Sequence, residues 1–322
     1  LAFGVDLAAR DSATVGGLVA TNAGGIHTVR HGSMRAQVLG VEAVLAGGDV
    51  LRRWLPLRKD NVGYDLPGLL TGSEGTLAVI TGVLVRLVAR PRRTAVCVAA
   101  VDSVEDALAL AARVEESGEV LRAVELMTAE GVELVVAAGA RRPMSTASSL
   151  FVLIETEGSA AALAEQIAAG DVIDAVVDDG PAPALWELRE LHTETIARST
   201  STPVVKLDVS VPLPAVGALI DDAAQVAGEF GARSIPFGHL GDGNLHVNLL
   251  DVAPADADAV VHRVLQTVVD LGGSISAEHG VGRAKASSVG LERSAVDLAT
   301  MRAIKSALDP DGLLNPGVLF AD

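Results

Sequence analysis

Two histidines flank a short glycine-rich turn in the last third of the sequence. His239 and His246 enclose the segment Leu-Gly-Asp-Gly-Asn-Leu, and extended runs are expected at residues 234–237 and 245–250. Glycine and Asp-Gly pairs favour chain reversal, so this turn can bring both imidazoles to one point. Two imidazoles with a carboxylate and an open position suit a divalent metal of the zinc or manganese kind. The spacing alone fits equally well a polar hairpin with two hydrogen-bonded histidines.

A carboxylate and a histidine stand side by side in a second glycine-rich segment, residues 272–283. Adjacent residues point apart in an extended segment, so Glu278 can be a third metal ligand while His279 faces a substrate. Imidazoles titrate near neutral pH, which suits a general base. Taken alone, the segment favours a loop whose Glu and His only hydrogen-bond the backbone.

Two cationic side chains offer a carboxylate clamp. Arg189 and Thr193 are four residues apart in a segment expected to be helical, hence on one face, and Lys206 lies in the extended run that follows. Arg and Lys converging on one pocket would hold a carboxylate, Arg through a bidentate fork. On these residues alone, the favoured alternative is an exposed Arg and a strand-face Lys.

Glycine is also dense at residues 14–25 and 72–77. Neither segment is a dinucleotide fingerprint or a phosphate loop. Backbone without side chains lets a flat or anionic ligand approach closely, and composition does not say which ligand.

Composition excludes several classes of protein. The 322 residues suit two ordinary domains, or one large domain with a cap. Hydrophobic residues make up 49% and aromatics only 2%, so the core is built from Ala, Val and Leu. A net charge of −16 disfavours nucleic-acid binding, and no apolar run is long enough to indicate a membrane-spanning helix. The single cysteine, Cys97, excludes an intrachain disulfide and is expected to be a buried, inert thiol.

The sequence predicts strands that alternate with helices after a boundary near residues 90–93. This order indicates an α/β or α+β layered architecture. The chain begins with Leu rather than Met and without a signal peptide, so its start is expected to be an internal cut or a processing point. Strands are expected at residues 38–44, 76–80, 96–101, 121–127, 149–155, 172–178 and 204–211, and helices at 103–117, from 129, at 160–169, 183–198 and 214–230.

With these segments assembled, the chain resembles the FAD-linked oxidases of the vanillyl-alcohol oxidase and p-cresol methylhydroxylase (PCMH) superfamily. Within it, the chain is most similar to the D-2-hydroxyacid dehydrogenase branch, which includes glycolate oxidase D subunit, D-lactate dehydrogenase and D-2-hydroxyglutarate dehydrogenase. The motifs run in family order over essentially the whole chain, at residues 14–25, 31–35, 59–66, 72–81, 238–248, 276–282 and 309–317.

The resemblance implies an α+β fold in two parts. Residues 1–91 are expected to be the latter part of a PCMH-type FAD-binding domain whose N-terminal subdomain, with its FAD-cradling loop, is absent. Residues 92–322 are expected to be a substrate- and metal-binding cap domain with an antiparallel sheet and a C-terminal helical segment. Residues 309–322 return to the flavin in this prediction. The departures from the family pattern are Ala78, where Gly is usual, and His31, where an aromatic residue is usual.

The resemblance also implies residue roles. His239, His246 and Glu278 match zinc ligands, and His279 matches the catalytic base. Residues matching those that hold the substrate carboxylates and hydroxyl are Arg189, Thr193, Lys206 and Asn248. Segments that line the flavin contribute Asn22, Gly24, Gly25, Glu74, Gly75, Ile80 and Asn315.

The implied reaction converts a D-2-hydroxyacid into a 2-oxo acid with FAD and Zn²⁺, or Mn²⁺ in its place. The metal polarises the 2-hydroxyl, His279 takes its proton, and hydride passes from C2 to flavin N5. The implied partners are a small 2-hydroxycarboxylate and an electron acceptor, which is an electron-transfer flavoprotein, a quinone or a cytochrome. The protein is expected to form a homodimer. It is also expected in the cytoplasm, bound peripherally to a membrane through its electron acceptor.

Two other functions stay open at this point. One is a non-catalytic remnant that binds metal but not FAD. The other is a zinc hydrolase built on His239, His246 and Glu278, which leaves the flavin-type segments without a role.

Overall fold

The computed structural model describes residues 1–57 and 59–320. The chain forms two compact units. One comprises Leu1–Arg90 with Ile275–Asp322, and the other comprises Pro91–Ser274. Residues 321 and 322 of the segment predicted to return to the flavin lie outside the described residues. The two ligand-binding domains expected from the sequence, residues 1–91 and 92–322, stay a prediction.

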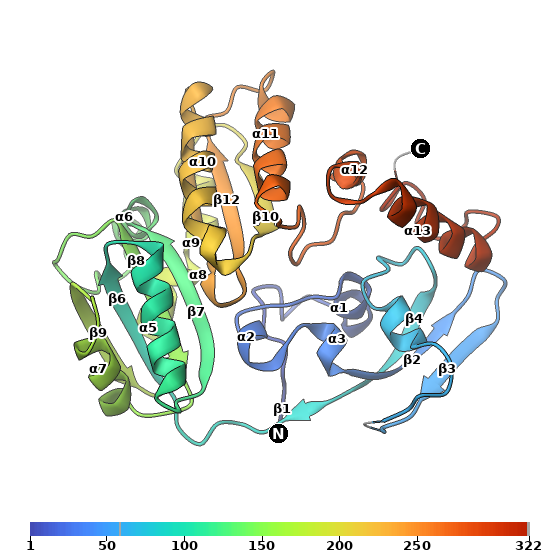
Figure 1. Ribbon diagram of the computed structural model, residues 1–322, viewed down its shortest axis with the longest axis horizontal. Helices are drawn as coiled ribbons and strands as arrows, with labels where there is room; N and C mark the ends of the chain where they lie inside the picture. Colours follow the sequence, from blue (N-terminus) through green and yellow to red (C-terminus); the bar gives the residue numbers. More distant parts are fainter. Residues whose placement is uncertain (58, 321–322) are drawn as a thin grey trace. The chain divides into compact units, whose positions relative to one another are not determined.

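The unit of residues 91–274 is built on one seven-stranded sheet (Figure 1). Every neighbouring pair of strands is antiparallel, as the sequence predicts for the cap domain. The strands, in their order across the sheet, are β10 (Val205–Ser210), β12 (Asn244–Leu250), β11 (Arg233–His239), β7 (Leu121–Thr128), β8 (Leu150–Thr156), β6 (Ala95–Val101) and β9 (Asp174–Asp179).

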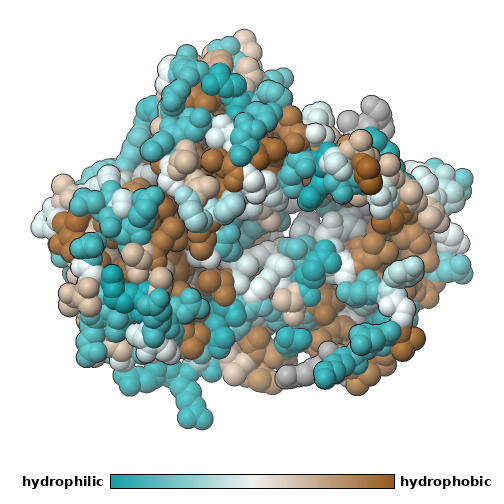
Figure 2. Space-filling model, in the orientation of Figure 1, coloured by the Kyte–Doolittle hydropathy of each residue, from teal (hydrophilic) through white to brown (hydrophobic). Residues whose placement is uncertain are grey.

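Helices cover both faces of this sheet. Helices α10 and α5 lie in front of it in Figure 1, and α8 and α9 lie behind it. Hydrophilic residues cover much of the outward surface of α10 and α11 (Figure 2), while Leu219 and Val264 face the core. The helices are α5 (Val104–Glu116), α6 (Ala129–Ala137), α7 (Ala160–Ala168), α8 (Pro183–Glu190), α9 (His192–Arg198), α10 (Val216–Glu229) and α11 (Ala257–Asp270), with single turns η1 (Leu213–Ala215) and η2 (Leu240–Asp242).

Small aliphatic residues fill the core between these layers. All seven residues of β6 are buried, as are Leu153 and Ile154 of β8 beside it. Cys97 belongs to this strand, and desolvation by burial raises the pKa of its thiol to about 12. The expectation of a buried thiol is therefore confirmed, and its raised pKa disfavours the reactive thiolate.

Local chemistry sets the helix ends largely as the sequence predicts. The Ser103 hydroxyl accepts a hydrogen bond from the backbone N–H of Asp106, which caps α5. The single helix predicted over residues 183–198 is wrong in one respect, because Leu191 separates α8 from α9. At this join the His192 ring bonds the Leu188 carbonyl through Nδ1 at 2.6 Å, so a side chain competes there for a helix carbonyl.

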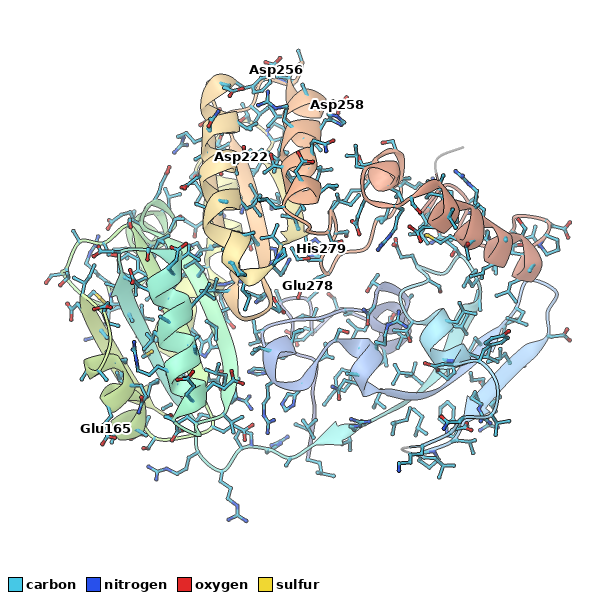
Figure 3. All side chains as sticks on the ribbon, in the orientation of Figure 1. Glu165, Asp222, Asp256, Asp258, Glu278 and His279 are labelled. Atoms are coloured by element: carbon cyan, nitrogen blue, oxygen red, sulfur yellow. The ribbon has the colours of Figure 1, made fainter. Side chains whose placement is uncertain are left out.

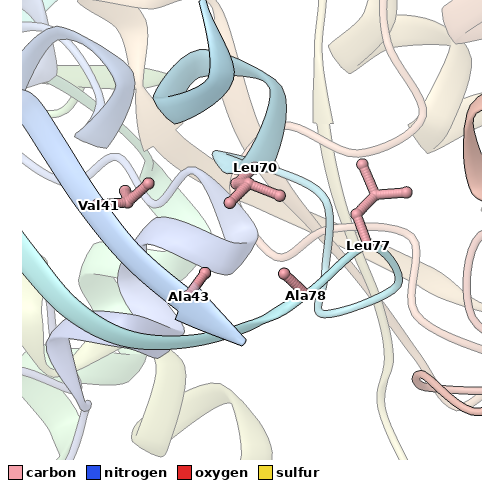
Figure 4. Packing of buried hydrophobic residues seen from close by; sticks show 5 residues of the cluster. All are labelled: Val41, Ala43, Leu70, Leu77 and Ala78. Atoms are coloured by element: carbon pink, nitrogen blue, oxygen red, sulfur yellow. The ribbon is translucent and has the colours of Figure 1, made fainter. Parts of the chain in front are cut away.

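The other unit contains a three-stranded sheet with the order β3-β2-β4 and a short β1–β5 ladder. Val41 and Ala43 of β2 pack with Leu70, Leu77 and Ala78 in a buried cluster (Figure 4). The elements are β1 (Ala2–Phe3), α1 (Val15–Thr21), α2 (Thr28–His31), α3 (Met34–Gln37), β2 (Val38–Val44), β3 (Val50–Trp54), α4 (Leu66–Leu70), β4 (Val79–Val85), β5 (Leu87–Val88), η3 (Ala286–Ser288), α12 (Val289–Glu292) and α13 (Ala295–Leu308).

The strand predicted at residues 76–80 begins later than expected, at Val79. Thr76 closes a turn, in which its backbone N–H and its hydroxyl both donate to the Ser73 carbonyl at 2.9 and 2.6 Å. Ala78 is 1% exposed within the buried cluster, so its methyl group packs against apolar neighbours.

Among the helices of residues 1–57 and 59–320, none is long and apolar enough to cross a membrane.

Candidate active site

Polar residues from four strands of the larger unit lie on one face of its sheet. Antiparallel register pairs Glu125 of β7 with His239 of β11, and Asp208 of β10 with His246 of β12. Alternate residues of a strand share a face, so Asn248 stands beside His246 on the same side. Four neighbouring strands therefore contribute to one polar cluster, which none of them could form alone.

The glycine-rich turn brings the two predicted histidines together. Their ring centroids are 5.3 Å apart and the rings are nearly perpendicular. Gly243 ends the turn with a φ of 75°, and a Cβ at this position would collide with the carbonyl oxygen of Val211. Glycine is therefore required for the reversal that places His239 next to His246.

A buried carboxylate that the sequence analysis missed connects two of the predicted residues. Glu125 is fully buried; its Oε1 lies 2.7 Å from Nδ1 of His239, and its Oε2 accepts a hydrogen bond of 2.6 Å from Nε of Arg189. Desolvation raises the pKa of Glu125, but the charges of His239 and Arg189 together outweigh it and hold this pKa below its ordinary value. Glu125 is therefore ionised at neutral pH and acts only as an acceptor.

Arg189 is 7% exposed, so the alternative of an exposed arginine is wrong. Its guanidinium also lies over the ring of Phe237, 4.6 Å from the centroid. Thr193, four residues further along, is exposed on α9, and Lys206 is exposed on β10 opposite Asn248. The Arg is thus held firmly, whereas the Thr and the Lys stand at the surface of the unit.

His246 is held beside a second buried carboxylate. Its Nδ1 lies 3.5 Å from Oδ1 of Asp208, which also accepts a hydrogen bond of 2.8 Å from the Asn244 amide. Desolvation by burial lowers the pKa of His246 to about 4, helped by the charge of Arg189 and opposed by Asp208. The ring is neutral at neutral pH, the form in which imidazole binds metals. The Asn248 amide donates to the backbone carbonyls of Ile235 and His246.

Glu278 and His279 belong to the other unit and lie on the coil that follows α11 (Figure 3). Residues 277–279 form bends, so the extended segment expected here is wrong. His279 is exposed. A Cβ on Gly24 would lie 2.8 Å from Oε1 of Glu278, so glycine is needed where the backbone passes this carboxylate.

Glu74 ties this coil to the glycine-rich segments of the same unit. Its carboxylate accepts hydrogen bonds from the backbone N–H groups of Val281 and Gly282, at 2.9 and 2.7 Å. Its own N–H donates to Ala20 at 2.7 Å, and its carbonyl accepts from the Asn315 amide. The segments predicted to line a flavin thus meet at Glu74, although its carboxylate is engaged with the protein backbone.

The remaining predicted flavin residues surround this junction. The Asn22 side chain accepts hydrogen bonds from the Ser33 hydroxyl and from the backbone N–H of Arg35. Gly25 and Gly75 have φ values of 135° and 71°, and Ile80 begins β4 together with Val79. Three of the predicted flavin residues that carry side chains also have left-handed backbone, with φ of 52° at Asn22, 50° at Glu74 and 43° at Asn315. Such strained conformations often accompany functional loops, and flavin contact stays a prediction.

Comparison with known proteins places these features in a family. The sequence profile described as "FAD linked oxidases, C-terminal domain" matches residues 90–319. The chain belongs to this family of FAD-linked oxidases. A second profile, "FAD binding domain", matches residues 1–53 of this FAD-linked oxidase.

Curated relatives of this FAD-linked oxidase lie in the branch expected from the sequence. It is 37% identical to "D-2-hydroxyglutarate dehydrogenase, mitochondrial" of Arabidopsis thaliana, over 97% of this chain and 58% of that protein. It is 38% identical to a "Putative D-lactate dehydrogenase", also described as mitochondrial, of Schizosaccharomyces pombe, over 98% of this chain and 64% of that protein. The chain therefore spans less than two thirds of the length of these relatives. The predicted resemblance is confirmed.

The fold of the chain is also similar to that of a protein of known structure. A solved structure of p-cresol methylhydroxylase with substrate bound matches with a TM-score of 0.68 at 15% identity, over 94% of this FAD-linked oxidase and 68% of that chain. At this identity the match supports the α+β fold alone.

Proposed function

We propose that this FAD-linked oxidase oxidises a D-2-hydroxyacid to the corresponding 2-oxo acid, using FAD and a zinc ion. The observation that carries the proposal is the buried series Arg189–Glu125–His239, which lies beside His246 on one sheet face. It combines a cation for a substrate carboxylate with two imidazoles for a metal. The names of the relatives support the D-2-hydroxyacid class, with D-2-hydroxyglutarate and D-lactate as the first substrates to test.

The donor set fits zinc. Nδ1 of His239 faces an ionised carboxylate and so carries a hydrogen, which leaves Nε2 as the nitrogen available to a metal. His246 is neutral because of its burial. We propose Glu278 as the third ligand on the basis of the family motif and its carboxylate chemistry. Two imidazoles and one carboxylate are a common catalytic zinc set, and manganese is the alternative metal.

The loops around Glu74 fit a flavin. Three of the proposed flavin residues are glycines, which let backbone approach a planar ring closely, and they are Gly24, Gly25 and Gly75. Glu74 and Asn315 hold these loops together, with Asn22 and Ile80 alongside. When bound, FAD supplies a hydride acceptor and zinc supplies charge that stabilises the substrate alkoxide.

The side chains of this chain position the substrate and move its proton. Arg189 holds the carboxylate through the guanidinium nitrogens that remain beside its Nε bond to Glu125. Asn248, Thr193 and Lys206 bind the other polar groups of the substrate, and the exposed Lys206 suits a second carboxylate. His279 accepts the hydroxyl proton.

The wider setting is proposed from the branch. Electrons leave the enzyme to an electron-transfer flavoprotein, a quinone or a cytochrome, and a homodimer is the proposed oligomer. A cytoplasmic location stays a prediction, since the word "mitochondrial" in the names above describes those relatives.

The catalytic assignment is tested by His279→Ala, with His262→Ala as a control. His262 is an exposed histidine on α11, outside the proposed machinery. His279→Ala should lose turnover of the D-2-hydroxyacid while the purified protein keeps its zinc, measured by elemental analysis, and His262→Ala should keep both. Retained activity in a His279→Ala protein, or retained activity in wild-type protein freed of metal, contradicts the assignment.

A further inference from the structure

Glu125 is the feature that the proposed mechanism does not yet use. It is fully buried in β7, and each of its two oxygens contacts a different group of the proposed site. One contact is with a proposed metal ligand, His239, and the other is with a proposed substrate-binding residue, Arg189. A buried carboxylate is costly to desolvate unless it is paired, and here both partners are functional candidates.

We propose that Glu125 is a positioning residue that couples the metal ligand to the carboxylate-binding arginine. The inference rests on the proposed function and deepens it. For His239, the carboxylate fixes both the ring orientation and the tautomer, because an ionised carboxylate can only accept. The hydrogen therefore sits on Nδ1, and Nε2 is the nitrogen that faces a metal.

For Arg189, the same carboxylate fixes the plane of the guanidinium. Oε2 holds the Nε edge at 2.6 Å, and the Phe237 ring supports the guanidinium face at 4.6 Å. With one edge and one face held, the guanidinium loses little further freedom when a carboxylate binds to its remaining donors. The Glu125 side chain thus orients both the His239 ring and the Arg189 guanidinium.

Glutamine in place of Glu125 can keep only one of the two contacts. Glu125→Gln keeps the shape of the side chain but replaces one acceptor oxygen by an NH₂ donor, so either His239 or Arg189 faces a donor. The matched control is Glu155→Gln on β8. Glu155 is also buried and accepts from an arginine Nε, that of Arg122 at 2.7 Å, and both residues lie outside the proposed site.

The first experiment measures the zinc affinity of the purified chain by competition with a chromophoric chelator. Glu125→Gln should lower zinc affinity about 10- to 100-fold, the usual range for loss of a carboxylate behind a metal-binding histidine. Glu155→Gln should bind zinc as the wild type does, although it also breaks a buried ion pair. Calorimetric binding of D-2-hydroxyglutarate should weaken in Glu125→Gln and stay unchanged in Glu155→Gln.

The second experiment needs no variant at position 125. Nitrogen-15 NMR of the imidazoles in the metal-free wild type, with His239→Gln to assign the resonance, should show a hydrogen on Nδ1 of His239. An Nε2–H tautomer overturns the inference even if Glu125→Gln fails to fold. Zinc affinity that Glu125→Gln leaves unchanged overturns the role of Glu125 alone. Absence of zinc binding in the wild type overturns the proposed metal site, and the metal-positioning role with it.

Discussion

Acid should destabilise the unit of residues 91–274 through His192. This side chain is fully buried, bonds the Leu188 carbonyl through Nδ1, and packs against Phe237 with ring centroids 5.0 Å apart. Desolvation by burial, with the nearby charge of Arg189, lowers the pKa of His192 from 6.5 to about 4. The ring is therefore neutral in the folded protein at pH values where the unfolded chain binds a proton.

The sign and size of the effect follow from that shift. Between about pH 6.5 and pH 4 the unfolded state binds more protons, so the free energy of unfolding falls as the pH is lowered through this window. At pH 5 the loss attributable to His192 is about 2 kcal/mol, and over the whole window it is about 3 kcal/mol. This is a large part of the ~5–15 kcal/mol that stabilises a typical domain.

The assay is urea unfolding followed by tryptophan fluorescence, which includes the buried Trp186 of the same unit, at pH 7.5 and pH 5. His192→Phe keeps an aromatic ring against Phe237 and removes the titrating group, so it should lose about 2 kcal/mol less than the wild type on acidification. His262→Gln, which changes an exposed histidine, should behave as the wild type. Equal pH dependence in the wild type and in His192→Phe would refute the reasoning.

Four further outcomes are expected. Gly131→Ala places a Cβ 2.6 Å from Nε2 of His192 and should cost about 1–3 kcal/mol of stability, which thermal unfolding checks; an unchanged transition contradicts this packing. Gly280 has a φ of 73°, and a Cβ at this position would collide with the carboxylate of Glu74, a proposed flavin residue. Gly280→Ala should therefore lower turnover with little change in the unfolding of residues 91–274. Arg189→Lys should raise KM about 10-fold or more, because lysine cannot keep both the Glu125 bond and a forked contact to the substrate; an unchanged KM argues against the clamp. Chelation of zinc should abolish turnover, and added Zn²⁺ should restore it.

The strand and helix order of the larger unit could be predicted because its signals are local. Alternation of apolar runs with capped helices located most elements, and the Gly-Asp-Gly turn located the His239–His246 pair. The break at Leu191 escaped prediction because it depends on where the buried His192 ring finds a carbonyl. Helical periodicity continues through such a break.

Glu125 could not be found from spacing. It stands between the apolar residues Val124 and Leu126 of β7, and its partner His239 is 114 residues away in the sequence. The two meet only because β7 and β11 pair in one register. Glu74 shows the same limitation, since its carboxylate bonds the backbone N–H groups of Val281 and Gly282, more than 200 residues further along. Long-range pairing of this kind is a property of the fold, which a single sequence pattern does not contain.

The proposed reaction is tested most directly by anaerobic reduction of the flavin in the FAD-loaded chain. D-2-hydroxyglutarate, D-lactate and their L enantiomers are added separately to protein with and without zinc, and the loss of the oxidised flavin absorbance is followed. The account predicts bleaching by at least one D enantiomer, none by its L counterpart, and none after zinc is removed. Equal bleaching by both enantiomers, or bleaching that survives zinc removal, would contradict it.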